Sequence, residues 1–235
     1  MRMLAARWTV AVISIALLSG TGVAQERRVT GRPDRTPDLS GMWRSTSNRY
    51  LMDLTAGSSP VVFQPWGRAL YDERRAANGK GRPSERCLPR GVPAMMLARD
   101  EPWKIVQTPG MVIILFHESL HYRQIFTDGR SFPEDAAPTW LGYSIGRWDG
   151  DVLVAETTGL TEKTWLDDSG HPHSDALHVI ERFRRTSARL MDVEMTIDDV
   201  KAYARPWTAK VRFESVSNAD LGEHVCAVAP ADDRQ

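Results

Sequence analysis

One unit recurs from Trp103 to Ser215: a short run of alternating apolar and polar residues, followed by a turn. In 207–215 every second residue from Trp207 to Phe213 is apolar, and the residues between them are polar or charged. A period of two places the apolar set on one face of a β-strand. Turn dipeptides such as Pro109-Gly110 and Asp149-Gly150 join antiparallel neighbours, because parallel strands need long crossovers. The pattern therefore predicts an all-β, mainly antiparallel fold.

About eight to ten strands are expected on this pattern. After a first strand at Gly41-Met42-Trp43, they lie at 103–108, 111–117, 122–127, 141–148, 152–158, 177–185, 190–197 and 207–215. Sequential antiparallel strands close most simply into a single up-and-down β-barrel, with a two-sheet sandwich as the alternative. One inserted helix is predicted at 63–79, with Pro65 in its first turn and Trp66, Ala69 and Leu70 at helical spacing. An irregular stretch follows at 80–93.

The first 24 residues read as an export signal. Arg2 and Arg7 give the positive start, 8–18 is apolar but short for a membrane crossing, and small residues end at Ala24. We expect cleavage after Ala24 and a periplasmic or secreted protein with no stable membrane anchor, an uncleaved anchor being the alternative. A disordered leader at 25–37, one β-barrel domain at 38–228 and a flexible tail at 229–235 complete the predicted organisation.

The chain has two cysteines, Cys87 and Cys226, both after the signal. An even number in an exported protein predicts a disulfide between them, with two free buried thiols as the alternative. Charge is balanced, with 30 Lys and Arg against 30 Asp and Glu. Such a balance gives no electrostatic footprint for nucleic acid or for an anionic membrane, and we expect neither partner. The sequence carries no signal for oligomeric state.

Gly142-Tyr143-Ser144-Ile145-Gly146 matches the G-x-S-x-G elbow of serine hydrolases. That elbow needs a strand followed by a helix, whereas here a strand, an Asp-Gly turn and another strand follow. A serine hydrolase at Ser144, with a downstream acid and His, stays an alternative. The preferred interpretation is a strand whose two glycines allow close packing or a bulge.

His117-Glu118-Ser119-Leu120-His121 matches H-E-x-x-H, which on a helix binds zinc. Strand-like residues flank it on both sides, so a hairpin through Glu118-Ser119-Leu120 is the better interpretation. His171, His173 and Asp175 alternate in a Gly- and Pro-rich segment, where they would share one face of an extended chain. They could ligate a metal ion, or one His could act as a general base; a polar loop with incidental His is the third interpretation.

Four segments together resemble a family of exported bacterial proteins of unassigned function. They are Pro37-Asp38-Leu39-Ser40-Gly41-Met42-Trp43; Tyr122 to Arg130; Gly142 to Trp148; and Gly170-His171-Pro172-His173-Ser174, preceded by Trp165-Leu166-Asp167. The resemblance covers most of 37–228. Gly41-Met42-Trp43 also resembles the opening of lipocalins, so the resemblance implies a lipocalin- or calycin-like barrel and no particular reaction.

These observations define a predicted site for a small, partly apolar molecule at the barrel interior or mouth. His173 is the predicted base of a cofactor-independent isomerase, lyase or hydrolase, and Arg123 clamps an anion or carbonyl. Tyr143 and Glu156 orient the substrate, and His171, Trp140 and Trp165 bind it. No cofactor is expected, with a metal at His171, His173 and Asp175 as the alternative. A barrel that binds the same ligand without chemistry is the second hypothesis.

Overall fold

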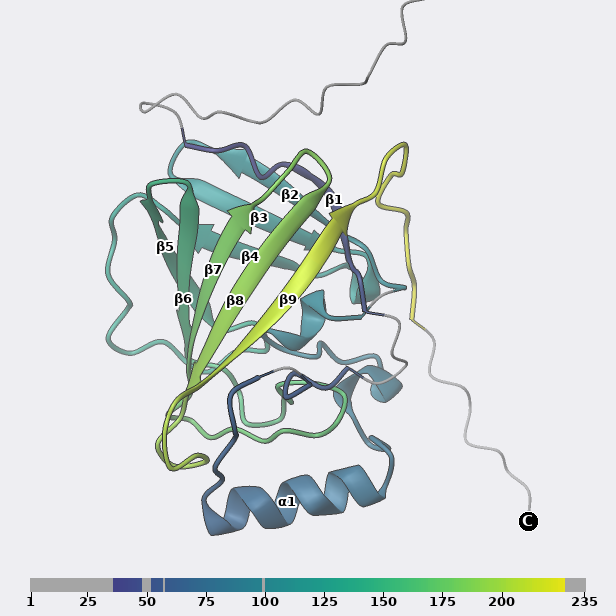
Figure 1. Cartoon of the computed structure of the whole chain (residues 1–235), viewed down its shortest axis with the longest axis vertical. Helices are drawn as coiled ribbons and strands as arrows, with labels where there is room; N and C mark the ends of the chain where they lie inside the picture. Colours follow the sequence, from purple (N-terminus) through teal and green to yellow (C-terminus); the bar gives the residue numbers. More distant parts are fainter. Residues whose placement is uncertain (1–35, 48–51, 57, 99, 227–235) are drawn as a thin grey trace, which may run out of the picture.

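The computed structural model describes residues 36–47, 52–56, 58–98 and 100–226. In this part of the chain nine strands close into one barrel, each paired with its neighbours in sequence and β9 paired with β1 (Figure 1). The strands are β1 (Gly41–Ser45), β2 (Trp103–Thr108), β3 (Met111–Phe116), β4 (Tyr122–Phe126), β5 (Tyr143–Asp149), β6 (Val152–Thr158), β7 (His178–Arg185), β8 (Leu190–Asp198) and β9 (Trp207–Ser215). The predicted all-β, mainly antiparallel barrel with one inserted helix is confirmed.

One strand pair departs from the up-and-down pattern. All neighbours are antiparallel except β4 and β5, which pair in parallel through Ile125 with Ser144 and Phe126 with Ile145. An odd number of strands in a closed ring cannot alternate in direction throughout, so nine strands require such a pair. The connection from 127 to 142 supplies the crossover that the parallel pair needs.

The predicted strands from 103 onward all form, and their bounds differ from the expectation by at most two residues. The H-E-x-x-H segment is a short 3₁₀ turn, Glu118–Leu120, between β3 and β4, as the hairpin interpretation predicts. The turn cannot align its two histidines as an α-helix would. His117 instead turns toward Glu101.

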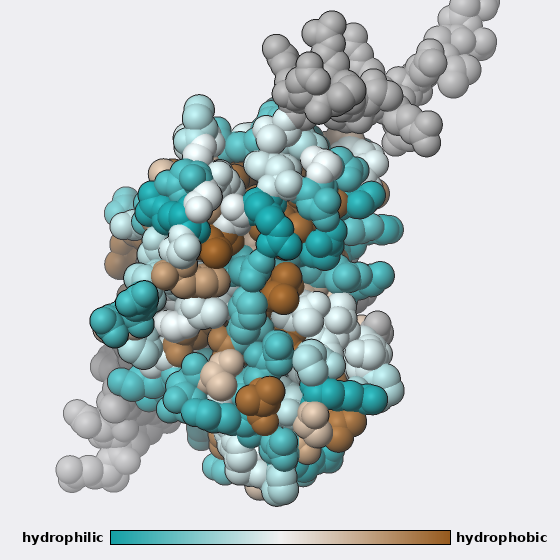
Figure 2. All heavy atoms as spheres, turned by 90° about the vertical axis from the view of Figure 1, so that its left-hand side faces the viewer, coloured by the Kyte–Doolittle hydropathy of each residue, from teal (hydrophilic) through white to brown (hydrophobic). Residues whose placement is uncertain are grey.

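Large side chains fill the barrel. Those least exposed to solvent that point inward include Trp43, Trp103, Phe116, Phe183, Trp207 and Phe213. Trp43 donates its indole N–H to the carbonyl of Leu39 at 3.0 Å, and the Arg185 guanidinium lies 5.3 Å from the centre of its ring. The interior is therefore a packed core, and any ligand site must lie beside it or at an end. On the face that carries β5, hydrophobic residues reach the surface as separate patches among hydrophilic ones (Figure 2).

The inserted helix α1 (Pro65–Ala76) lies across one end of the barrel, with irregular segments between (Figure 1). It is shorter than the predicted 63–79: it begins at Pro65, which lies in the first turn as predicted because proline has no N–H to satisfy there, and it ends at Ala76. Its buried residues are Gly67 and Tyr71, whereas the predicted face residue Trp66 is exposed. The helix approaches the backbone at Ala202 so closely that a Cβ on Gly67 would lie 2.8 Å from the Ala202 carbonyl oxygen. The buried face of the helix is therefore defined by the close approach at Gly67 and by the buried Tyr71.

The two glycines of the G-x-S-x-G pentapeptide are packing residues within β5 and its approach. Gly142 has φ +65°, and a Cβ there would lie 2.6 Å from the carbonyl oxygen of Thr158. A Cβ on Gly146 would lie 2.8 Å from the Ile125 side chain. The interpretation of this segment as a strand with close-packing glycines is confirmed, since β5 runs through Ser144 to Asp149.

Cys87 and Cys226 form the predicted disulfide. It ties the segment after β9 to the irregular stretch that follows α1. Arg90 fixes the same stretch through buried ion pairs with Glu118, at 2.7 Å, and with Asp168. The predicted signal peptide 1–24, most of the leader 25–37 and the tail 229–235 lie outside the described residues. Among the described residues no helix is both long and apolar enough to cross a membrane.

Candidate functional site

The segment between β6 and β7 carries the predicted histidines and lies buried at the end of the barrel that α1 covers (Figure 1). His171 and His173 expose 1% and 4% of their surface. Arg74 of α1 lies over the Trp165 ring at 4.3 Å, and Tyr203, after β8, donates its hydroxyl to the Pro172 carbonyl at 2.7 Å. The helix and the β8–β9 connection thus clamp the segment from two sides.

An aspartate–histidine dyad is the chemical centre of this region. Asp167 Oδ2 lies 2.7 Å from His171 Nδ1, and both side chains are buried. Because Nδ1 donates to the carboxylate, the ring's lone pair belongs to Nε2. Backbone N–H groups of Gly170 and His171 bond to Oδ1 of the same carboxylate, and that of Leu54 bonds to Oδ2. These bonds fix the acid and its partner in a geometry suited to general-base catalysis.

The dyad borders a pocket of about 300 Å³ between α1 and the segment that precedes it. Its lining combines hydroxyls, two arginines and an apolar wall: Thr55, Ser58, Ser59, Pro60, Val61, Phe63, Arg68, Tyr71, Arg75 and His171. Tyr71 packs on His171 with ring centres 4.3 Å apart, and its hydroxyl accepts a hydrogen bond from Arg75 at 2.9 Å. Burial raises the pKa of Tyr71, so its phenol stays protonated at neutral pH. The pocket suits a small molecule with an anionic group and an apolar part.

His173, the predicted base, has both ring nitrogens occupied by the protein. Nε2 lies 2.7 Å from the Thr164 hydroxyl, and Nδ1 lies 3.0 Å from the Ser174 carbonyl. Burial lowers its pKa below the usual value. His173 is buried although it lies in a loop, because α1 and the β8–β9 connection cover this loop. His173 supports the segment that presents His171.

Acidification should therefore destabilise the protein through His173. The unfolded state takes up a proton near pH 6.5, while the buried native ring resists it, so below about pH 6.5 the unfolded state binds more protons. The free energy of unfolding should fall by at most about 1.4 kcal/mol per pH unit from this group. Urea unfolding of wild type and His173→Gln at several pH values measures it: the stability advantage of the wild type should shrink as pH falls. An advantage that is constant or grows would contradict it.

The alternative metal ligands His171, His173 and Asp175 do not converge. Asp175 is exposed and pairs with Lys201 at 2.5 Å, while the two histidines bond to Asp167 and Thr164. A different trio, Asp53, Asp167 and His171, presents one ligand atom each within 4.8 Å of one another. However, the Asp167 oxygens already accept four hydrogen bonds, which occupies the carboxylate's lone pairs. The donor set at Asp167 therefore favours a base over a metal ion.

Arg123 points into the barrel and is held by partners from other strands. It forms an ion pair with Glu181 of β7, and it donates to Ser144 Oγ at 3.0 Å and Thr157 Oγ1 at 2.7 Å. The Ser144 and Thr157 hydroxyls lie 2.9 Å apart. All six histidines of the chain lie in the described residues, and none hydrogen-bonds to Ser144. The geometry gives no support to Ser144 as a nucleophile.

A cleft of about 610 Å³ lies where β4 and β5 separate beyond their two paired positions. Its lining includes the predicted residues Arg123, Tyr143 and Trp140 together with Ser144. Arg123 Nη1, and Oε1 of its ion-pair partner Glu181, are buried without a hydrogen-bonding partner among the described residues. This cleft is the second candidate for a ligand site, because Arg123 connects its lining to the buried ion pair inside the barrel.

The remaining predicted residues lie apart from both hollows or at their edges. Glu156 is on the outer face of β6, paired with Arg147 at 2.5 Å and His178 at 3.2 Å. Trp165 is buried beneath Arg74. The structure thus divides the predicted site into the region at the α1 end, with His171, His173 and Trp165; the β4–β5 cleft; and the outer face.

Sequence reasoning missed Tyr71 and Arg75. The spacing of Asp167 four residues before His171 across a glycine was the available signal for the dyad.

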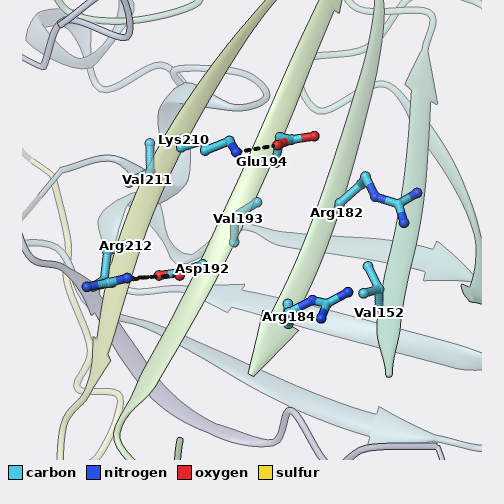
Figure 3. Close-up of a pocket in the computed structure, with 9 residues that line it drawn as sticks. All are labelled: Val152, Arg182, Arg184, Asp192, Val193, Glu194, Lys210, Val211 and Arg212. Carbon is cyan, nitrogen blue, oxygen red and sulfur yellow. Dashed lines mark hydrogen bonds and ion pairs between the residues drawn. The ribbon is translucent and has the colours of Figure 1, made fainter. Parts of the chain in front are cut away.

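A further hollow of about 480 Å³ lies on the outer face of β6–β9 (Figure 3). Its charged residues form cross-strand pairs: Lys210 with Glu194 at 3.0 Å, and Arg212 with Asp192 at 2.6 Å. None of the histidines lines it. Exposed pairs of this kind are typical of the solvated face of a sheet, and we assign no chemistry to it.

Comparison with known proteins gives no assignment, because no family model matches the chain and no curated protein matches it.

Proposed function

We propose that the protein is a periplasmic or secreted enzyme that catalyses proton transfer on a small anionic, partly apolar molecule, with His171 as the general base. The observation that carries this proposal is the buried Asp167–His171 pair at the edge of a polar pocket. The reaction class is an isomerisation, elimination or hydrolysis that starts with proton removal. The apolar export-type segment at the N-terminus and the Cys87–Cys226 disulfide support the location.

The chemistry follows from the hydrogen bonds. His171 Nε2 takes a proton from the substrate, and the imidazolium that forms is stabilised by the Asp167 carboxylate on the other side of the ring. Four hydrogen bonds hold that carboxylate in place, so little reorganisation accompanies the charge change. Arg68 and Arg75 line the pocket and can hold an anionic group of the substrate, while Phe63 supplies the apolar contact.

His171, rather than the predicted His173, is the proposed general base because the ring nitrogens of the two residues have different partners. One nitrogen of His171 is oriented by an acid and the other remains for substrate, whereas both nitrogens of His173 bond within the protein. The predicted roles of Arg123, Tyr143 and Trp140 belong to a second candidate function, ligand binding without chemistry in the β4–β5 cleft. Arg123 lines that cleft, and its Nη1 has no hydrogen-bonding partner in the part of the chain that the structure describes, which favours this function.

A general base can be tested before the substrate is known. A nitrobenzisoxazole reports a base in an apolar or aromatic site, since loss of one ring proton opens the ring to a coloured cyanophenolate. The wild type should accelerate this elimination, and His171→Gln should reduce the rate about 10²–10⁴-fold. Asp167→Asn should give a comparable loss because it removes the acceptor that fixes the ring.

His178→Ala is the matched control, since His178 lies on the outer strand face beside Glu156. Its rate should equal that of the wild type. Equal rates for wild type and His171→Gln, or a wild-type rate no higher than that of the same concentration of free imidazole, would contradict the proposal.

A further inference from the structure

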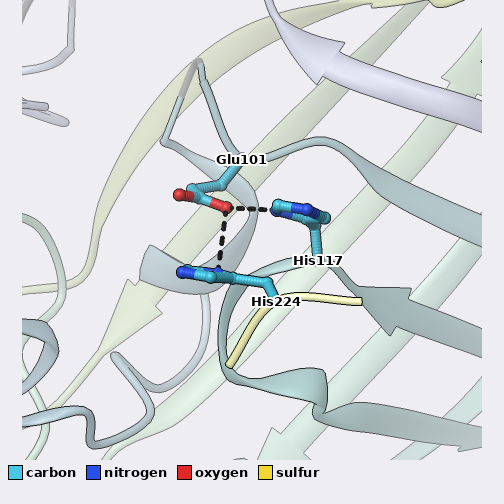
Figure 4. Close-up of side chains that lie close together, drawn as sticks. All are labelled: Glu101, His117 and His224. Carbon is cyan, nitrogen blue, oxygen red and sulfur yellow. Dashed lines mark hydrogen bonds and ion pairs between the residues drawn. The ribbon is translucent and has the colours of Figure 1, made fainter. Parts of the chain in front are cut away.

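Three side chains from distant parts of the sequence meet on the surface away from the Asp167–His171 dyad. Glu101 precedes β2, His117 follows β3, and His224 lies in the segment that leads to Cys226 (Figure 4). The imidazole rings of the two histidines stack with centres 5.0 Å apart, and both face the Glu101 carboxylate. The exposed fractions of the three side chains lie between 24% and 33%, so ions can reach them.

We propose that Glu101, His117 and His224 bind a divalent transition-metal ion of the zinc class. Each offers one ligand atom, and these atoms lie within 4.8 Å of one another. Nδ1 of His117 lies 2.8 Å from Glu101 Oε2, and Nδ1 of His224 lies 3.9 Å from the same oxygen. Two imidazole nitrogens and one carboxylate oxygen are a ligand set that zinc and its neighbours accept.

The state of His224 is a separate observation that points to a ligand. Its Nδ1 is buried and has no hydrogen-bonding partner among the described residues, because 3.9 Å to Glu101 is too long for a hydrogen bond. A buried nitrogen without a partner costs free energy. A cation between the three side chains would satisfy this nitrogen, His117 Nδ1 and the carboxylate together.

Glu101 also differs from Asp167 in what its oxygens have to offer. Among the described residues its carboxylate bonds to His117 Nδ1, a contact that the metal would replace as this nitrogen gives up its proton, whereas the Asp167 carboxylate accepts four hydrogen bonds. The Glu101 carboxylate can therefore coordinate a metal ion more readily than the Asp167 carboxylate can.

Metal binding would join the segment after β9 to the β2–β3 hairpin, beside the Cys87–Cys226 disulfide. Three protein ligands leave a position for water, as in open zinc sites. Since the ligands come together only in the folded chain, binding should also stabilise the fold.

Zinc titration followed by calorimetry tests the site, using protein without an affinity histidine tag. The wild type should bind one equivalent of Zn²⁺. The variants Glu101→Gln, His117→Ala and His224→Ala should each weaken binding by at least about tenfold. His178→Ala should bind as the wild type does. Absence of saturable binding in the wild type, or affinity unchanged in all three variants, would overturn the proposal.

NMR of the histidine ring nitrogens in the wild type tests the site without any variant, so a variant that fails to fold does not affect the result. Zn²⁺ should shift Nδ1 of His117 and His224 most strongly and leave His171 unmoved. A shift at His171, with loss of zinc binding in His171→Gln, would place the ion at Asp53, Asp167 and His171 and overturn this assignment. Neither measurement uses catalytic activity. A negative result for the metal site would therefore leave the proposed role of His171 as a base unaffected, and the reverse also holds.

Discussion

Replacing Glu181 with leucine should lower the free energy of unfolding by about 3–5 kcal/mol, because it leaves a buried arginine without its anionic partner. Arg123 and Glu181 expose 2% and 0% of their side chains, and they meet inside the barrel. The Ser144 and Thr157 hydroxyls would still accept hydrogen bonds from Arg123, but neither carries the compensating charge. Urea unfolding, followed by circular dichroism and tryptophan fluorescence, measures the loss.

The double variant Arg123→Met/Glu181→Leu is the matched control. It removes both charges and fills the space with apolar side chains, and such replacements of buried ion pairs are often neutral or stabilising. The double variant should therefore recover most of the stability that Glu181→Leu loses. If the double variant is as unstable as the single one, shape rather than unpaired charge explains the effect, and the argument from the ion pair fails.

This pair marks the limit of what strand patterns reveal. The alternation in each strand assigns Arg123 and Glu181 to inward faces once the register is known. Yet they sit on β4 and β7, which are not neighbours in the sheet, and they meet across the interior. From sequence, an arginine among apolar strand residues suggests a ligand clamp. Only the closed barrel reveals that a glutamate 58 residues away meets it.

The fold itself is encoded locally, and for that reason it could be predicted. Turn dipeptides and a period of two set most strands and their order, and Pro65 sets the start of α1. The parallel β4–β5 pair could not be predicted in this way. It depends on the total number of strands and on the path of 127–142, which are properties of the whole ring rather than of a segment.

In the candidate site, too, local features could be predicted from the sequence, whereas features that depend on distant residues could not. His171, His173 and Trp165 could be singled out because they lie in one unusual segment, and the structure keeps them together. Their roles depended on partners from elsewhere: Leu54 and Tyr71 around the dyad, and α1 covering the loop. Those partners decide whether His171 or His173 has a ring nitrogen available for substrate. The alternation of residues in the sequence could not show which of the two histidines is the base.

Removing the Cys87–Cys226 disulfide should also lower the free energy of unfolding strongly, as Glu181→Leu does. A bond between residues separated by 139 positions restricts the unfolded chain strongly, and chain-entropy arguments assign it about 4–5 kcal/mol as an upper value. Part of this should be offset, because no strand or helix follows β9 in the described residues. Without Cys226 this segment gains freedom in the native state as well. We expect the double variant Cys87→Ser/Cys226→Ser to lose about 3–5 kcal/mol of unfolding free energy.

Urea unfolding of the wild type and the double variant, each with and without reductant, separates the bond from the side chains. Reductant should bring the wild type to the stability of the variant and leave the variant unchanged. Limited proteolysis adds the location: the variant should be cut first after β9, where the disulfide and the His117–His224 contact hold the segment to the rest of the protein. Equal stability of the two proteins, or first cuts within the barrel, would show that the bond does not hold this segment.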